Sequence, residues 1–369
     1  MRKNVKQQLA LRVLSTAALM AMVSSIATAA FADTYDLNKG SVTVETKENG
    51  ITYVTQLDNT QKDGYARNDK DDILHDYQDK TGVTITSDGR QTSNTITVET
   101  AKDQTTDVTL EDVFINREGA RNSDSEAALT VKGDGDTNLE LNGDNTVLVE
   151  NRWSEEHAAI EKADKYGTGT LTIKDDVNDN GTEKSGTEAD TTGKLVAGGD
   201  HEAAAIGGGA GDLGDTSNIT ITGGDITAIG GVDGGSGIGG GGRPGGTGKN
   251  ICIEGNAHVT ATAEEGAAIG GGATGGNSIT IKDHAVVNAY GIYGAAIGDG
   301  GLYASSGRPT TITISGNATV HAEASQDGCA IGSGQHGNFD DLTINIEENA
   351  NVTAIGPYDT PAIGNNRCS

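Results

Sequence analysis

The sequence predicts an all-β fold, a right-handed parallel β-helix whose coils of about 31 residues each hold three short strands. Three observations support this fold. A Gly-rich motif recurs at nearly constant spacing, and apolar-polar-apolar triplets recur between its copies. The chain also holds 55 glycines but only 4% aromatic residues, so a thick aromatic core is excluded and a narrow aliphatic one is favoured.

The recurring motif is Ala-Ala-Ile-Gly-Gly-Gly, and residues 267–272 are one copy of it. Its central apolar residue recurs after 31, 46, 32, 31, 28, 34 and 32 residues, a spacing typical of a solenoid. We therefore expect the central residues to form one vertical file inside the solenoid, one on each coil. These residues are Leu129, Ile160, Ile206, Ile238, Ile269, Ile297, Ile331 and Ile363.

Two further strands per coil follow from strict alternation. In Ile279-Thr280-Ile281 the two isoleucines share one face and Thr280 points to the other, as in a β-strand. Val287 comes six residues after Ile281, Ala289 follows two residues later, and the same spacing recurs in the neighbouring repeats. Each coil is therefore expected to contain an Ala-Ile-Gly strand, an Ile-Thr-Ile strand and a Val-Thr-Ala strand.

A tight turn is expected between the second and third strands. Asn256, Asn317 and Asn349 occupy equivalent positions in this turn, and His284 replaces asparagine once. Asparagine tolerates the left-handed conformation and forms local hydrogen bonds in turns. On stacked coils, these amides can also bond to one another as a ladder.

The N-terminus predicts export. Residues 1–32 combine a basic start, an apolar run over 9–30 and the small-x-small pattern Ala30-Phe31-Ala32, which is typical of a secretory signal peptide. The alternative is a retained anchor helix. After signal cleavage no stretch is apolar enough to span a membrane, so we expect an extracellular, secreted or surface-associated protein.

Three regions are expected after the signal peptide. Residues 33–82 lack the repeat and are interpreted as an N-terminal cap, with a short amphipathic helix over 71–77. Residues 83–369 are interpreted as the parallel β-helix. The one long step, of 46 residues, predicts an insertion over 175–193, and insertions in solenoids form loops on one side.

The charge of the chain excludes several partners. The formal net charge is −27, and removal of the four basic residues in 1–32, a segment without acids, lowers it to −31. Such a charge repels nucleic acid and anionic lipid and lacks the basic footprint of a nucleic-acid binder. We expect a monomer that binds no nucleic acid.

The insertion contains one candidate metal site. Asp176, Asn178, Asn180 and Glu183 supply oxygen atoms in a segment that matches the first half of an EF-hand calcium loop. The match ends there, because the loop's twelfth position is Thr187 and not glutamate. Calcium is the only cofactor that the sequence predicts, and an acidic solvated loop is the alternative.

The three cysteines are too few for a disulfide framework. A Cys329–Cys368 disulfide between neighbouring coils is one prediction, and buried or idle thiols, Cys252 included, are the other.

A candidate ligand-binding surface lies on the third strand of each coil. Its outward residues form two neighbouring columns, which present hydroxyl, amide and ring groups. Such a surface can form hydrogen bonds with an extended polysaccharide and stack on it, whereas ordinary solvent-facing β-residues are the alternative. The residues expected to bind the ligand are Thr260, Asn288, Tyr290, His321 and Thr353.

Catalysis is not expected, and no catalytic residue is assigned. Asp340 and Asp341 follow Gly334-Gln335-His336-Gly337, which distantly resembles the carboxylates and Gly-His-Gly of polygalacturonases. The order is inverted and the basic partner motif is missing. Glycoside hydrolysis needs two suitably spaced carboxyl groups, and an acidic chain offers many chance pairs.

The repeats Ala-Ala-Ile-Gly-Gly-Gly, Gly-Asn-Ser-Ile-Thr-Ile and Val-Asn-Ala resemble the Gly-rich β-helical repeat of surface proteins from Gram-positive gut bacteria. The resemblance covers about residues 127–369. It implies an adhesin-like or carbohydrate-binding β-helix protein whose partner is a polysaccharide or cell-surface glycan. A related β-helix family binds acidic plant polysaccharide with calcium. The alternatives are a lyase or hydrolase of acidic polysaccharide, and a structural stalk.

Overall fold

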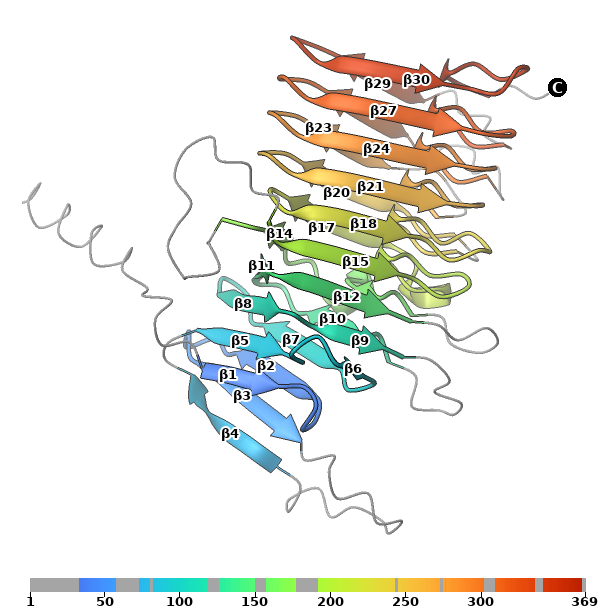
Figure 1. Ribbon diagram of the computed structural model, residues 1–369. Helices are drawn as coiled ribbons and strands as arrows, with labels where there is room; N and C mark the ends of the chain where they lie inside the picture. Colours follow the sequence, from blue (N-terminus) through green and yellow to red (C-terminus); the bar gives the residue numbers. More distant parts are fainter. Residues whose placement is uncertain are drawn as a thin grey trace, which may run out of the picture.

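The computed structural model describes residues 33–57, 73–79, 82–117, 126–149, 157–176, 192–242, 245–272, 275, 277–301, 309–335 and 341–366. These residues form a β-solenoid of about seven turns, each of about 32 residues, as the sequence predicts. The coils are stacked along one axis (Figure 1). The described residues contain no α-helix, only the single 3-10 turns Asp164–Tyr166 and Gly211–Leu213.

The described strands form three sheets along the sides of the solenoid. Sheet A has ten strands and runs, from the N-terminal end, through β1 (Asp33–Asp36), β5 (Val83–Thr86), β8 (Thr105–Glu111), β11 (Asp136–Asn142), β14 (Leu171–Lys174), β17 (Thr216–Ile221), β20 (Gly248–Ile253), β23 (Ser278–Ile281), β26 (Thr310–Ile314) and β29 (Leu342–Ile346).

Sheet B has twelve strands, most of them only two residues long, in the order β4 (Ile73–Asp79), β3 (Thr52–Leu57), β2 (Val42–Thr46), β7 (Ile96–Thr100), β10 (Leu129–Lys132), β13 (Ile160–Glu161), β16 (Ile206–Gly207), β19 (Ile238–Gly239), β22 (Ile269–Gly270), β25 (Ile297–Gly298), β28 (Ile331–Gly332) and β31 (Ile363–Gly364).

Sheet C has nine strands, in the order β6 (Gln91–Thr92), β9 (Phe114–Asn116), β12 (Asp144–Leu148), β15 (Lys194–Gly198), β18 (Asp225–Ile229), β21 (His258–Ala263), β24 (Val286–Gly291), β27 (Thr319–Ala324) and β30 (Asn351–Ile355). In each repeating coil the chain passes through sheets B, A and C in turn.

The predicted file of central residues is confirmed. Each of the eight, from Leu129 to Ile363, pairs in parallel register with the next one in sheet B. The file also continues toward the N-terminus through Ile96 and Val42. These two lie outside the Ala-Ile-Gly motif, so the sequence repeat did not identify them.

The core is a narrow stack of aliphatic side chains. On sheet A, Ile251, Ile279 and Ile312 lie one above another and are buried. On sheet C, Ala261 and Ala289 do the same with smaller side chains. All ladders between repeating coils are parallel, so backbone hydrogen bonds run from coil to coil. Each coil therefore pairs the backbone N–H and C=O groups of its neighbours.

The tight turn between sheets A and C differs from the expectation in one detail. The left-handed residue is the one before asparagine or, in one coil, before His284, with φ of +65° at Gly255, +61° at Asp283 and +58° at Glu348. The amide of Asn349 donates to Asn317 over 3.4 Å, so an exposed ladder forms between these two coils. The ladder is therefore present, but a different residue adopts the left-handed conformation.

The N-terminal region also differs from the expectation. Strands β1 and β2 already pair in parallel with β5 and β7, so the parallel pairing of the solenoid extends back at least to Asp33 and not only to residue 83. The helix expected over 71–77 is wrong, because residues 73–79 form β4. Strands β3 and β4 continue sheet B with antiparallel pairing and cover its end (Figure 1).

At the other end, the last described coil is more exposed than the coils before it. Ile346 and Ile363 point inward yet are 43% exposed, whereas Ile314 and Ile331, one coil earlier, are fully buried. No described residue stacks on the outer side of this coil, so its inner face and strand edges stay uncovered by the described chain.

Candidate functional site

Sheet C carries the columns of outward residues that the sequence predicted. Thr260 pairs with Asn288, Asn288 with His321, and His321 with Thr353, so four of the five predicted ligand-binding residues lie on successive coils. All four are partly exposed. The parallel register places them about 4.8 Å apart along the solenoid axis.

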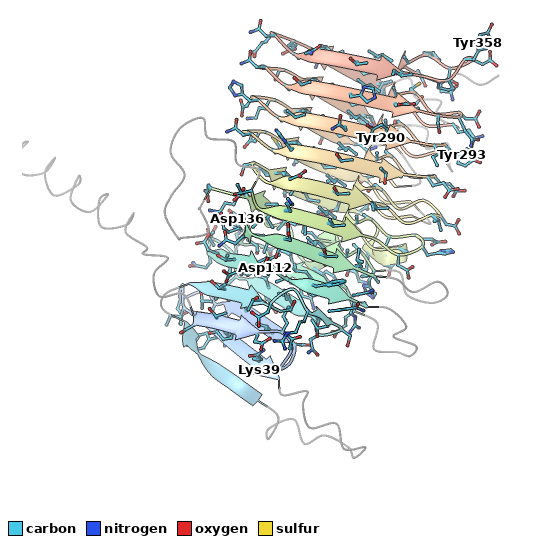
Figure 2. The ribbon with its side chains drawn as sticks, in the orientation of Figure 1. Lys39, Asp112, Asp136, Tyr290, Tyr293 and Tyr358 are labelled. Atoms are coloured by element: carbon cyan, nitrogen blue, oxygen red, sulfur yellow. The ribbon has the colours of Figure 1, made fainter. Side chains whose placement is uncertain are left out.

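The fifth predicted residue, Tyr290, belongs to the neighbouring column. Its register partners are Thr262 on one side and Glu323 on the other, and Glu323 in turn pairs with Ile355. Figure 2 shows Tyr290 on the outward face beside β24. The structure therefore brings all five predicted residues onto one face, in two adjacent columns.

A groove runs along this face where sheet C meets the following loops. Its volume is about 440 Å³, and its lining comes from four successive coils. Tyr290 lies on the third of these coils, and the lining changes from aliphatic at one end to polar at the other. The lining residues are Ile229, Gly230, Val232, Thr262, Ala263, Glu264, Tyr290, Gly291, Ile292, Glu323 and Ser325.

The groove combines apolar and polar groups. Ile229, Val232 and Tyr290 are 47%, 52% and 38% exposed, so the groove presents apolar side chains to solvent. Glu264 and Glu323 add carboxylates, and none of the lining residues is a lysine or an arginine. A site of this kind, apolar with a few polar groups, fits a small or extended organic ligand.

Three side chains form a contact cluster beside the groove. The rings of Tyr290 and His321 are 5.9 Å apart between centroids and tilted by 56°. Nε2 of His321 lies 3.6 Å from Oε2 of Glu323. These contacts place the ring of His321 beside the groove residues Tyr290 and Glu323.

Sequence reasoning missed the loop residues Val232, Glu264 and Ile292. All three lie in the loops that follow sheet C. The latter two come two residues after Thr262 and Tyr290, which are outward residues of the strands. This constant offset identifies Glu264 and Ile292, but it can be recognised only once the ends of the strands are known.

The predicted calcium loop is described only at its two ends. Asn178, Asn180 and Glu183 lie outside the described residues, and Asp176 pairs with Lys174 at 3.1 Å. Partial burial raises the pKa of Asp176, but a hydrogen bond with Glu140 and the charge of Lys174 together hold it below its usual value. The described residues contain no group of three metal-ligating side chains, and calcium binding stays a prediction.

The buried Asp175 holds the ends of the insertion together. Its Oδ2 accepts hydrogen bonds from the backbone N–H of Gly193, at 2.9 Å, and from the hydroxyl of Thr192, at 3.4 Å. The insertion therefore leaves and rejoins the coil at one point. This explains how a step of 46 residues keeps Ile160 and Ile206 in register.

Two of the three cysteines, Cys252 and Cys329, lie in the part of the chain that the structure describes. Partial burial, a hydrogen bond to Glu254 and the charge of that carboxylate raise the pKa of Cys252 to about 12, so its thiol stays protonated at neutral pH. Cys329 is buried. Cys368 lies outside the described residues, and the Cys329–Cys368 disulfide stays a prediction.

A second ionisable cluster is buried near sheet B. Glu161 is fully buried, and its Oε2 lies 2.7 Å from Nδ1 of His157 and accepts the backbone N–H of Ala158. Burial and the nearby Glu161 carboxylate raise the pKa of Tyr166 well above its usual range. Glu161 is closed off from solvent, so its carboxylate contacts neighbouring residues and is not presented at the surface.

Other expectations concern residues that lie partly or wholly outside the described ranges. Of the Asp340–Asp341 pair, only Asp341 is described, and His336 also lies outside. The predicted signal peptide over 1–32 lies outside as well and stays a prediction. Where the chain is described, no helix has the length and apolar character needed to cross a bilayer.

Comparisons with known proteins give no relative: no protein family, no curated protein and no solved structure matches this chain.

Proposed function

We propose that this chain is a secreted or cell-surface β-solenoid that binds an extended glycan along the outward face of sheet C and performs no chemistry on it. The observation that carries the proposal is the groove around Tyr290, which is about 440 Å³ in volume and crosses four coils. The adhesin-like resemblance of the repeat and the predicted signal peptide support the location.

The chemistry of the face suits a sugar polymer. Sugar rings have apolar C–H faces that pack on aromatic and aliphatic side chains, and Tyr290, Ile229 and Val232 offer such surface. Sugar hydroxyls need hydrogen-bond partners, which the adjacent column supplies through Thr260 and Asn288. Both kinds of group repeat along the solenoid axis, so they fit a ligand that is itself a repeating chain.

The length of the groove supports a polymer over a single sugar. Four coils at about 4.8 Å per step extend over about 14 Å, which is longer than one sugar ring. The hydroxyl and amide column continues beyond the groove to Thr353. A chain bound parallel to the axis therefore meets similar groups at successive coils.

Binding to a glycan array, in the presence of calcium, tests this proposal. We expect the full chain to bind a defined set of oligosaccharides and Tyr290→Ala to weaken that binding about fivefold, since a lost stacking contact costs about 1 kcal/mol. Tyr53→Ala is the matched control, because Tyr53 is a half-buried tyrosine on cap strand β3 at the far end of the solenoid. Circular dichroism checks that both variants fold.

Two results would contradict the proposal. One is the absence of binding to any glycan on the array or to cell-wall material. The other is equal weakening of glycan binding by Tyr290→Ala and Tyr53→Ala, which would show that binding does not depend on the groove. Incubation with pectin and related uronans, followed by assays for new reducing ends and unsaturated products, distinguishes binding from the lyase or hydrolase alternative.

A further inference from the structure

We propose that the glycan bound by the sheet C groove carries free amino groups and is therefore cationic. This inference rests on the proposed function and names its ligand class. The geometry behind it is the position of two carboxylates on either side of Tyr290.

Glu323 is the neighbour of Tyr290 along the solenoid axis, and Glu264 lies on the preceding coil, displaced along the chain from the register partner of Tyr290. In register, Tyr290 pairs with Thr262 on the preceding coil and with Glu323 on the following coil. Glu264 comes two residues after Thr262, on the same coil as that threonine. Both glutamates line the groove, so a sugar ring stacked on Tyr290 has a carboxylate toward each neighbouring ring.

Two carboxylates elsewhere on the outer surface pair with lysines of an adjacent coil. Glu254 pairs with Lys282 at 2.7 Å and Asp144 with Lys194 at 3.3 Å. The groove differs, because no lysine or arginine lines it and the basic group beside it is His321. A cationic ligand supplies at the groove the countercharge that Lys282 and Lys194 supply to those two carboxylates.

Acidic and neutral glycans fit the groove less well than a cationic one. An acidic polysaccharide would place its carboxylates against Glu264 and Glu323, on a chain whose formal net charge is −27. A neutral glycan would reduce the hydration of both glutamates without replacing it by opposite charge. Protonated sugar amines gain from both the local pair and the field of the whole molecule.

A basic peptide is a weaker candidate than an amino sugar polymer. Strands β21 and β24 are paired on both sides, so no strand edge is open in the groove for a peptide to extend the sheet. The remaining contacts are an aromatic ring and aliphatic side chains with carboxylates beside them. This combination matches a sugar ring that bears an amine.

Calorimetric titration of the full chain tests the inference with four probes of similar length at one slightly acidic pH. The probes are oligomers of β-1,4-linked glucosamine, the same oligomers fully N-acetylated, oligogalacturonate and oligolysine. We expect the amine form to bind about tenfold more tightly than the acetylated form, and oligogalacturonate to bind least.

The double substitution Glu264→Gln with Glu323→Gln keeps side-chain size and removes both charges. We expect it to reduce the preference for the amine form to about twofold or less, while binding of the acetylated form stays unchanged. Glu99→Gln with Glu347→Gln is the matched control, because both glutamates are exposed, lie outside the groove and change the net charge equally. This control is expected to retain the preference.

Each other outcome has a definite meaning. If the acetylated or acidic oligomer binds as tightly as the amine form, the inference is overturned while glycan binding stands. An equal loss of preference in both double variants would mean unspecific attraction to an acidic rod, and binding of oligolysine alone would mean a peptide site. If no sugar binds, the proposed function fails first.

Discussion

Asp299 occupies a position where three other coils have glycine. Gly208, Gly240 and Gly271 follow the paired glycines of sheet B, as Asp299 follows Gly298. Its side chain is fully buried, and its Oδ1 accepts hydrogen bonds from Asn277 at 2.5 Å and Thr310 at 2.6 Å. Burial raises the pKa of Asp299 to about 7, and the two hydrogen bonds offset only part of that effect.

This shift makes stability depend on pH. The pKa of Asp299 is raised on folding, so between about pH 4 and pH 7 the folded chain holds a proton that the unfolded chain has released. The free energy of unfolding therefore falls as pH rises through this window and is lowest above it. Below about pH 4, the carboxyl is protonated in both states and has no such cost.

Asp299→Asn tests this, because asparagine keeps the acceptor oxygen and cannot ionise. We expect the variant to be more stable than the parent by up to about 4 kcal/mol at pH 8 and nearly equal to it at pH 4. Urea unfolding across pH measures the difference. Asp225→Asn, at an exposed position of β18, is the control and should change little at either pH. Equal effects of Asp299→Asn at both pH values would refute the expectation.

At the scale of single elements, the glycines of sheet B set the spacing between coils. Gly270 has a φ of +137°, and a Cβ atom there would lie 2.0 Å from the carbonyl oxygen of Gly298. Gly239, Gly298 and Gly332 have the same conformation and equally close contacts. The repeated glycine therefore serves two purposes, a backbone angle that L-residues rarely adopt and the close approach of one coil to the next.

Gly364 offers a matched control within the same column. Its φ is +129°, but nothing lies within 4 Å of a Cβ built there. We expect Gly270→Ala to cost about 3 kcal/mol or more, from backbone strain and a steric clash together, and Gly364→Ala about 1 kcal/mol from strain alone. Thermal and urea unfolding of the two variants compares them. Similar losses would mean that the clash is relieved at little cost.

At the scale of the whole molecule, each coil contacts mainly its neighbours, so stability is a sum over coils and their interfaces. The last described coil has an interface on one side only, and its inward Ile346 and Ile363 are 43% exposed. The N-terminal end is covered by the antiparallel strands β3 and β4. The described solenoid is thus unequally protected at its two ends.

Hydrogen exchange followed by mass spectrometry tests this asymmetry. We expect the backbone amides of β29 and β30 to exchange first and those of central strands such as β21 and β24 to exchange last. The N-terminal strands β5 and β8 should resemble the central strands, because the chain continues on both sides of them. Uniform exchange along the chain would show that the solenoid unfolds as one unit.

The repeat in the sequence determined the stacking of the coils and the residues that face outward on sheet C. Regular spacing of Ile269, Ile297 and Ile331 predicted their vertical file, because stacking identical coils places equal positions one above another. Strict alternation predicted which residues of sheet C face outward, including Asn288 and Tyr290. Both inferences need only the order of residues along the chain, since strand geometry and stacking are the same in every coil.

Where the sequence pattern is weak, and where neighbouring coils contact one another, only the tertiary structure determined the outcome. The extension of the solenoid back to Asp33 depends on pairing between β1 and β5, whose paired residues are fifty apart in sequence and share no motif. The groove depends on loops that bring Val232, Glu264 and Ile292 to one side, and the shifted pKa of Asp299 depends on its burial among neighbouring coils. These features arise from contacts between segments distant in sequence, and no local periodicity records such contacts.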